Sequence, residues 1–328
     1  MKQCFGKIDL HRHLETSHRF EDVFELSRQH KLPVLSLLTE EQIKQLFRLP
    51  QKPLYWNQWY QHLLLLRNAY HSLECVKELS KRVICDAGKE RIDHLELRFS
   101  LLSMTSAGLD SNFPIPTDFF SRAHKIIEKI IEGAAATKGP VPSCVRLICS
   151  LSIGNKYSNM LGHLPDLLIP HVSCIAGLDL ILNEEPDWKE LSRTLSILRE
   201  KFRYLTIHHW ERDNSFSSIK ILDYKPDRLG HGIRALFYPD VLDKIIDNNI
   251  TLEICPLSNL LYREALAGLE THPIADMVRL GIPITINSDG TMYGQTLHDN
   301  FLWVRNAFGF NDKILDDIEN NAIKARFV

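Results

Sequence analysis

The chain contains 328 residues, of which 44% are hydrophobic and 24% charged, and its formal net charge is −2. The apolar content excludes a disordered chain, and the nearly balanced charge excludes the basic surface expected of a nucleic-acid-binding protein. No apolar run approaches the roughly 20 residues that span a membrane, and the N-terminus lacks the apolar core of a secretion signal. The seven cysteines include no CxxC pair, as expected of reduced thiols in a cytoplasmic protein. We expect the chain to act on a small molecule and to be able to form oligomers.

Short apolar runs with strand-forming composition recur along the chain, and segments with helical periodicity separate them. Most of these runs are continuously apolar, as expected of strands that are buried on both faces. Strands that alternate with helices predict a single α/β domain over residues 1–328, a closed (β/α)8 TIM barrel. A doubly wound open sheet is less favoured, because no glycine-rich fingerprint follows any of the runs. The eight expected strands are Lys7–His11, Ile92–Phe99, Val145–Leu151, Ile175–Leu180, Tyr204–His208, Arg228–His231, Ile250–Cys255 and Pro283–Ser288.

The connection between the first two expected strands is unusually long. About 80 residues separate them, far more than a simple crossover needs. The segment contains helical patterns and an aromatic stretch with Trp56, Trp59 and Tyr60. We expect residues 18–88 to form a helical cap over the mouth of the barrel.

Histidines and one aspartate stand at the ends of the expected strands. His11 and His13 are two residues apart, so in a strand their side chains point the same way. His208 ends the fifth expected strand, and Asp289 follows the eighth, which closure of a barrel brings beside the first. Three imidazoles and one carboxylate predict a single divalent metal, with Zn²⁺ the best fit and Fe²⁺ or Mn²⁺ as alternatives.

Two further titratable side chains follow strand ends. Glu211 stands three residues after His208, and His231 lies between Gly230 and Gly232. Taken alone, the glycine-flanked histidine could belong to an ordinary loop. The shared position of all these residues at the C-terminal ends of strands favours one active site.

These motifs together resemble the adenosine deaminase family of metal-dependent barrel hydrolases. The resemblance implies that His11, His13, His208 and Asp289 bind the metal, and that Asp289 also accepts a hydrogen bond from the nucleophile. It further implies that Glu211 protonates the ring nitrogen beside the attacked carbon. His231 would orient the nucleophile and stabilise developing charge. The matching stretches are His11–Glu15, Gly177–Leu180, Leu205–His208, Arg228–Gly232, Leu252–Asn259, His272–Ile274 and Ile286–Asp289.

The reaction that the resemblance implies is hydrolytic deamination of an adenosine-like aminopurine or a related heterocycle, with release of ammonia. The expected substrate-binding residues depart from the family's pattern, so the exact substrate stays open. Trp210 has two interpretations, a stacking platform for a base or a core residue that points away. The substrate-binding candidates are Glu15 (usually Asp, but Glu in adenine-acting relatives), Asp179 (in a stretch that matches the family), Leu182 and Trp210 (each where the family has glycine), and Gly290 (usually a second Asp).

Two other functions are compatible with the same residues. A metal-binding family member with weak or no catalysis and a regulatory role would tolerate Trp210 and Gly290. A barrel hydrolase of another C–N bond or of an ester would also tolerate the changed substrate contacts. Release of ammonia distinguishes the deaminase from both.

Overall fold

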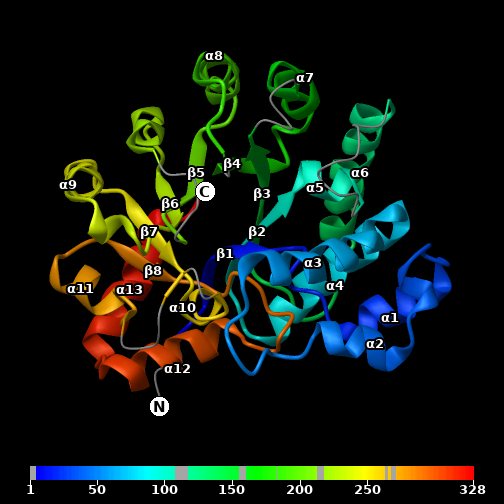
Figure 1. The fold of residues 1–328 in the computed structure, drawn as a ribbon, viewed down its shortest axis with the longest axis horizontal. Coiled ribbons are helices and arrows are strands. Elements are labelled where there is room, and N and C mark those ends of the chain that lie inside the picture. The colour runs from blue at the N-terminus through cyan, green and yellow to red at the C-terminus, as the bar shows by residue number, and fades with distance from the viewer. Residues whose placement is uncertain are drawn as a thin grey trace.

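Eight parallel strands form one sheet in the order of the sequence, and helices surround them in the computed structural model (Figure 1). The structure describes residues 5–107, 117–154, 160–182, 184–212, 218–262, 265–266 and 271–328. The strands are β1 (Ile8–His13), β2 (His94–Ser100), β3 (Cys144–Ile153), β4 (Ile175–Leu182), β5 (Tyr204–His209), β6 (Arg228–His231), β7 (Thr251–Ile254) and β8 (Ile284–Ile286).

The first and last strands meet just beyond the end of β8. The backbone N–H of Asp289 donates to the carbonyl of His11 at 2.8 Å, and the N–H of His13 donates to the carbonyl of Asp289 at 2.7 Å. β1 runs to His13, where it also pairs with Arg98 of β2, and so continues beyond its expected end at His11. The predicted (β/α)8 barrel is confirmed.

The helices follow from capping and apolar periodicity in the sequence. In α8, for example, the Asp187 side chain accepts hydrogen bonds from the first N–H groups of the helix, and Leu191, Leu195 and Leu198 are buried against the sheet. In the part of the chain that the structure describes, no helix is long and apolar enough to cross a membrane. The α-helices are α1 (Phe20–Gln29), α2 (Glu40–Leu46), α3 (Trp56–Leu66), α4 (Leu73–Lys89), α5 (Leu101–Thr105), α6 (Phe119–Ala135), α7 (Leu164–Leu168), α8 (Trp188–Arg199), α9 (Pro239–Asp247), α10 (Pro256–Asn259), α11 (Ile274–Arg279), α12 (Leu297–Phe308) and α13 (Asp312–Ala325). The described 3-10 turns are η1 (Leu35–Leu37), η2 (Arg67–His71), η4 (Ile169–His171), η5 (Ile219–Tyr224) and η6 (Ala235–Phe237).

The long connection between β1 and β2 contains two parts with different positions. Its last helix, α4, packs along α6 on the outside of the barrel. The preceding α3 contacts the loop after β7, where the rings of Trp56 and Trp59 meet the ring of Tyr262 edge-on at centroid distances of 5.1 and 5.2 Å. The backbone N–H of Leu54 also donates to the carbonyl of Leu261 at 2.8 Å. The residues before α4 therefore reach across to the C-terminal side of β7.

The interior of the barrel holds paired charges as well as apolar side chains. Arg98, Arg228, Glu96 and Glu253 are all at most 1% exposed. Arg98 Nη2 lies 2.9 Å from Glu253 Oε2, and Arg228 Nε lies 2.6 Å from Glu253 Oε1. At the far end from the site, the Phe327 ring packs under the Arg228 guanidinium at 3.5 Å, close to the chain end at the centre of Figure 1. This network joins the strands across the barrel and reaches the candidate site through Glu253.

Candidate active site

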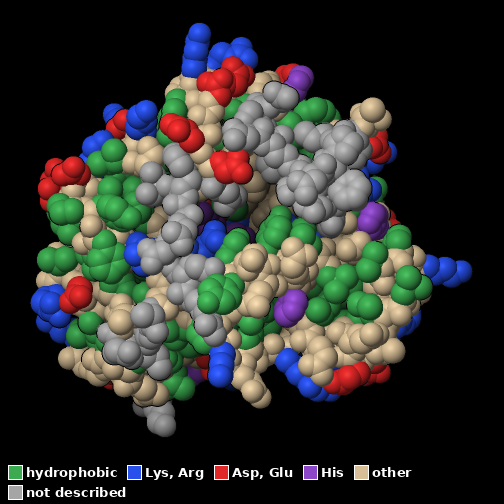
Figure 2. Space-filling model, viewed as in Figure 1, with side chains coloured by type: hydrophobic (Ala, Val, Ile, Leu, Met, Phe, Trp, Pro, Cys, Tyr) green, Lys and Arg blue, Asp and Glu red, His purple; other side chains and the backbone are tan. Residues whose placement is uncertain are grey.

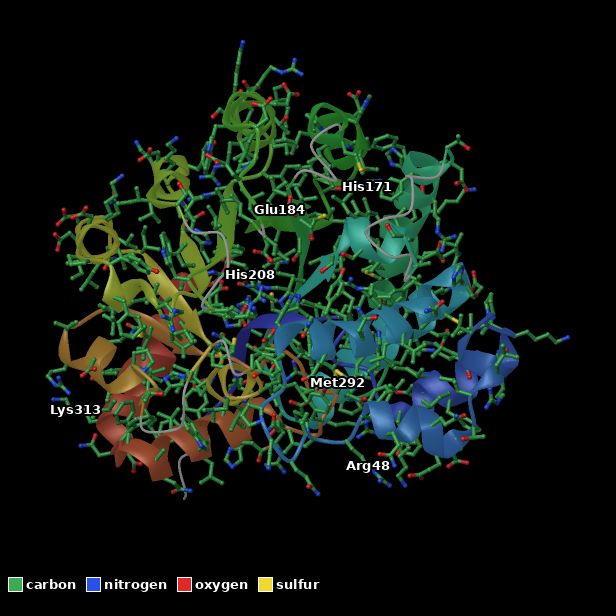
Figure 3. All side chains as sticks on the ribbon, in the orientation of Figure 1. Arg48, His171, Glu184, His208, Met292 and Lys313 are labelled. Atoms are coloured by element: carbon green, nitrogen blue, oxygen red, sulfur yellow. The ribbon has the colours of Figure 1, made fainter. Side chains whose placement is uncertain are left out.

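A pocket opens at the C-terminal ends of the strands. Figure 2 shows the corresponding face hollowed near its centre, and His208 lies at the middle of the strand ring in Figure 3. Strands on opposite sides of the barrel contribute to the pocket, because every parallel strand ends at this face. The titratable residues predicted at strand ends that line it are His13, His208, Glu211, His231 and Asp289.

Three imidazoles and one carboxylate converge at one side of this pocket. His13 Nε2 lies 3.3 Å from His11 Nε2 and 3.1 Å from His208 Nε2. Asp289 Oδ1 lies 3.5 Å from His13 Nε2 and 3.8 Å from His11 Nε2. The four residues that the sequence predicts as metal ligands are therefore together in space.

Two buried carboxylates orient the outer imidazoles of this cluster. His11 Nδ1 donates to Glu253 Oε2 at 2.8 Å, and His208 Nδ1 donates to Asp179 Oδ1 at 2.8 Å. Such contacts hold the ring proton on Nδ1 and leave the Nε2 lone pair toward the cluster. Asp179 is fully buried and also accepts from Ser150, so it lies beneath the pocket and contacts His208 instead of a ligand.

The electrostatic surroundings favour neutral rings at two of the three histidines. Burial, followed by the nearby Arg98 charge, lowers the pKa of His11 well below its ordinary value. Burial and then the neighbouring His208 lower the pKa of His13 in the same way. Burial also opposes charge on His208, but the Asp179 carboxylate outweighs it and raises the pKa of that ring. His11 and His13 thus keep free lone pairs at neutral pH, as metal ligands must.

The spacing of the ligand atoms in the cluster suits a divalent metal ion. With metal–nitrogen bonds of about 2.0–2.1 Å, neighbouring tetrahedral ligand atoms stand about 3.3 Å apart. The imidazole nitrogens at 3.1 and 3.3 Å match this edge, and the carboxylate oxygen at 3.5 Å from His13 is close to it. The ligand atoms of one group, His11, His13 and His208, lie within 4.8 Å of one another. The same holds for a second group, His11, His231 and Asp289. The donor set and its spacing agree with a single divalent ion.

Glu211 and His231 form a second polar pair beside the cluster. His231 Nδ1 accepts from Asn259 Nδ2 at 3.1 Å, so the ring proton lies on Nε2, 3.6 Å from Glu211 Oε1. Burial lowers the pKa of His231 to about 3, which keeps the ring neutral. The Ser258 hydroxyl donates to Asp289 Oδ2, the carboxylate oxygen that is turned away from the imidazoles. The site therefore offers an imidazole N–H and two carboxylates to a ligand.

Three residues of the site have left-handed backbone conformations, which are uncommon for residues other than glycine. The φ angles are 50° at Trp210, 60° at His231 and 62° at Asp289. Such strain concentrates at functional sites and persists only where the surrounding structure holds it. At Trp210 the backbone has a conformation that glycine adopts without strain. The Trp210 indole is 3% exposed and packs on the His209 ring with centroids 4.3 Å apart, as a core residue does. It also lines the pocket, as a stacking platform for a base must.

The remaining substrate-binding candidates line the same pocket. Leu182 and Glu15 are 4% and 3% exposed, and one Glu15 oxygen accepts from the backbone N–H of Ser100 at 2.8 Å. A Cβ atom on Gly290 would stand 2.4 Å from the Thr16 hydroxyl and 2.7 Å from the Thr16 carbonyl. Gly290 therefore leaves space that Thr16 fills, which accounts for the missing second aspartate.

Sequence reasoning missed several residues of the site. Glu253 lies within an expected strand whose neighbouring residues are apolar. Its charge at an inward-facing position is the one sign in the sequence that it belongs to the site. Thr16 and Arg67 line the pocket from segments whose path could not be predicted from periodicity. The pairing of Thr16 with Gly290 appears only when β8 lies beside β1.

Comparisons with known proteins identify relatives of this chain. The family model described as adenosine deaminase matches residues 6–328. An adenosine deaminase of Clostridium botulinum (strain Kyoto / Type A2) is 24% identical over 336 residues, which cover 98% of this chain and 92% of that protein. The apo structure of the N6-methyl-AMP deaminase from Arabidopsis thaliana superposes with a TM-score of 0.78 at 20% identity, covering 99% of this chain and 93% of the other. The adenine deaminase of Arthrobacter aurescens gives a TM-score of 0.78 at 19% identity, covering 99% and 94%.

Proposed function

The chain belongs to the adenosine deaminase family and is a hydrolytic deaminase of aminopurines, and on that premise we propose which residues carry the reaction. His11, His13, His208 and Asp289 are the residues that would hold the divalent metal, for which we propose Zn²⁺ because three imidazoles and one carboxylate suit that ion. When bound, such an ion supplies a Lewis acid that makes water a nucleophile at neutral pH.

Within this proposal, the protein's own groups position water and move protons. Asp289 and the Nε2–H of His231 hold the attacking water against the amino-bearing carbon of the ring. Glu211 donates a proton to the adjacent ring nitrogen, so that the carbon can become tetrahedral without charge building up on the ring. Asp289 takes one proton from the attacking water and passes it to the amino group, the C–N bond breaks, and ammonia leaves. The remaining proton of the added hydroxyl returns to Glu211 as the carbonyl forms, and the ring nitrogen keeps the proton that Glu211 gave it. Glu211 Oε1 and His231 Nε2 lie 3.6 Å apart, which supports a role for both groups at one reacting centre.

The helices before α4 complete the site on the solvent side. Trp56, Trp59 and Tyr60 line the pocket from α3, opposite the strand ends. We propose that residues 18–72 act as the cap, with α4 serving as an ordinary outer helix of the barrel. A closed apolar wall excludes bulk water and strengthens the electrostatic contacts inside.

The observation that carries the proposal is the convergence of His11, His13, His208 and Asp289 beside the Glu211–His231 pair. The test is an ammonia-release assay of zinc-loaded protein with adenosine, deoxyadenosine, adenine, AMP, ATP, guanine and pterins. Turnover of at least one aminopurine is expected. Stoichiometric metal with no ammonia from any of these compounds would contradict the proposed function and favour a binding or regulatory protein.

Glu211→Gln tests the proton donor separately. An amide of the same size cannot supply the proton, so kcat should fall about 10²-fold or more while the metal content stays the same. Glu184→Gln, at an exposed position after β4 that Figure 3 labels, is the matched control and should leave both quantities unchanged. Unchanged turnover of Glu211→Gln would remove Glu211 from the mechanism.

A further inference from the structure

Arg67 is a buried cation on the wall of the active-site pocket. It begins η2 directly after α3 and lines the pocket. It is only 7% exposed. We propose that Arg67 is the core of an anion-binding subsite, and that the aminopurine substrate of this chain is a nucleoside monophosphate. This inference rests on the proposed function and names the substrate class of the same site.

The partners of Arg67 do not neutralise its charge. Nη1 donates to the Tyr60 hydroxyl at 3.3 Å, and the guanidinium lies 5.4 Å from the Tyr60 ring centroid. Its Nε is buried without a hydrogen-bond partner, and no carboxylate pairs with Arg67 among the residues that the structure describes. Arginine is almost never this buried unless it is paired, because an uncompensated charge loses its hydration. A negatively charged group of a ligand would supply the missing partner.

The second arginine of the pocket is already engaged. Arg212 Nε lies 3.4 Å from Glu211 Oε2, and its guanidinium stacks 3.5 Å above the Trp56 ring. Arg212 is thus already in contact with Glu211 and Trp56. Arg67 is the arginine whose charge an incoming anion would meet.

Hydroxyl groups lie on the same wall as Arg67. η2 packs against α5, which carries Ser103, and Ser100 directly precedes that helix. Both serines line the pocket and are 8% and 6% exposed. A guanidinium with neighbouring hydroxyls is a donor set that suits phosphate oxygens.

Glu15 narrows the choice of ligand. One of its oxygens is held by the Ser100 N–H, and the other, Oε2, is buried without a hydrogen-bond partner in the described structure. A carboxylate can only accept, so the ligand must present a hydroxyl or N–H there. No ion pair joins Glu15 to Arg67, so the two groups can contact different parts of one molecule. A sugar phosphate provides a hydroxyl for Glu15 and an anion for Arg67, whereas a nucleoside or free base leaves Arg67 unpaired.

The kinetic test compares AMP with adenosine in the zinc-loaded wild type and in Arg67→Met, Arg67→Lys and Arg48→Met. Arg48 lies at the edge of the molecule (Figure 3) with its side chain 56% exposed, so it is the matched control. The wild type should prefer AMP in kcat/KM. Arg67→Met should lower kcat/KM for AMP about 10²-fold, as expected on loss of a buried charged contact, with less than about a threefold change for adenosine. Arg67→Lys should retain part of the preference, and Arg48→Met all of it.

A binding measurement separates this inference from the proposed function. IMP should raise the melting temperature of the wild type more than inosine does, and Arg67→Met should abolish the difference. If no compound releases ammonia but IMP still stabilises the protein through Arg67, the proposed function fails and the subsite stands. Stabilisation by inorganic phosphate equal to that by IMP would overturn the nucleotide assignment in favour of a free-phosphate site.

The unliganded variant distinguishes binding from packing. Removal of an unpaired buried charge should leave the melting temperature of Arg67→Met equal to or above that of the wild type. Equal losses for AMP and adenosine together with a lower melting temperature would assign Arg67 to packing and overturn the subsite. A wild type that prefers adenosine or adenine would overturn it as well.

Discussion

His13 is the central imidazole of the proposed metal cluster. Its Nε2 contacts the Nε2 atoms of both His11 and His208, at 3.3 and 3.1 Å, and it is the one of the three rings that lacks a carboxylate on Nδ1 among the described contacts. His13→Ala should therefore remove the metal and reduce ammonia release to background, because the variant loses the imidazole that lies between the other two ligand nitrogens. Metal content by atomic spectroscopy and the ammonia assay measure the two effects.

A second histidine pair supplies the control for this variant. His171 Nε2 lies 3.2 Å from His124 Nδ1, between η4 and α6, and Figure 3 places it away from His208. His171→Ala should keep full metal content. Metal retained at the wild-type level by His13→Ala would contradict the assignment of the cluster as a metal site.

Gly290 and Thr16 share one volume beside Asp289. Because a Cβ on Gly290 would lie 2.7 Å from both the Cβ and the carbonyl of Thr16, Gly290→Ala should lower the free energy of unfolding by about 1–3 kcal/mol. Thr16→Gly in the same chain should recover part of this loss, since it removes the side-chain half of the clash. Chemical denaturation of the two single variants and the double variant measures the coupling. Additive effects would show that the two residues do not compete for space.

At the residue scale, the residues of the proposed metal cluster could be picked out from the sequence, and the residues around them could not. His11 and His13 can be recognised from a local pattern, two histidines two residues apart at the end of a strand. Glu253 and Arg67 cannot be recognised in this way, because a single charged residue in an apolar run or at a helix end is common on protein surfaces. Their burial depends on contacts made only after the chain has folded, such as the pairing of Arg98 with Glu253 across 155 positions.

At the element scale, Phe327 closes the end of the barrel opposite the site. Its ring is 1% exposed, stacks on Tyr204 with centroids 4.5 Å apart, and lies against Arg228. Its N–H donates to Glu96 Oε1 at 2.7 Å. Phe327→Ala should lower the free energy of unfolding by about 3–5 kcal/mol through the cavity it leaves.

Val328, the next residue, provides the control for this loss of stability. The Val328 side chain is 71% exposed, so Val328→Ala should change the free energy of unfolding by less than about 0.5 kcal/mol. Urea denaturation of both variants measures the difference. Similar values for the two would mean that the Phe327 ring contributes little to closing the barrel.

The strands were predictable as elements because barrel strands are buried on both faces and contain continuous apolar runs. The ends of the strands were harder to predict. β1 continues to His13, and its register with β2 shifts between Asp9 and Arg12, an irregularity that depends on the neighbouring strands. The expected third strand ended at Leu151, whereas β3 runs to Ile153, where it still pairs with Leu182 of β4. Pairing partners, not local composition, decide where these strands stop.

At the scale of the whole molecule, closure of the barrel brings Asp289 beside His11 and creates the site from distant segments. The stability of the fold and the integrity of the site are therefore linked. Conditions that weaken the fold should weaken metal binding too. Low pH is one such condition, because burial lowers the pKa of several histidines outside the proposed metal cluster and keeps them neutral in the folded chain.

His272 is the clearest of these histidines. It is 3% exposed, its Nδ1 accepts from the Ile274 N–H at 3.3 Å, and its ring packs beside those of Trp303 and Phe308. Burial lowers its pKa to about 4, against about 6.5 in an unfolded chain. Between these two values the unfolded chain binds a proton that the folded chain does not. Its contribution to stability is therefore present above about pH 6.5 and is lost as the pH falls toward 4.

His272→Gln should flatten this part of the pH dependence, because glutamine keeps an acceptor but does not titrate. From pH 7 to pH 5 the free energy of unfolding of the wild type should fall by about 2 kcal/mol more than that of the variant, at about 1.4 kcal/mol per pH unit below 6.5. Urea denaturation at several pH values, with a chelator present in all samples, isolates the difference, since every other histidine is common to both proteins. Parallel pH profiles for the two proteins would mean that His272 is protonated, or accessible to protons, in the folded state. The loss of stability at low pH would then have to come from other buried groups, among which His18 stands first because burial lowers its pKa to about 3.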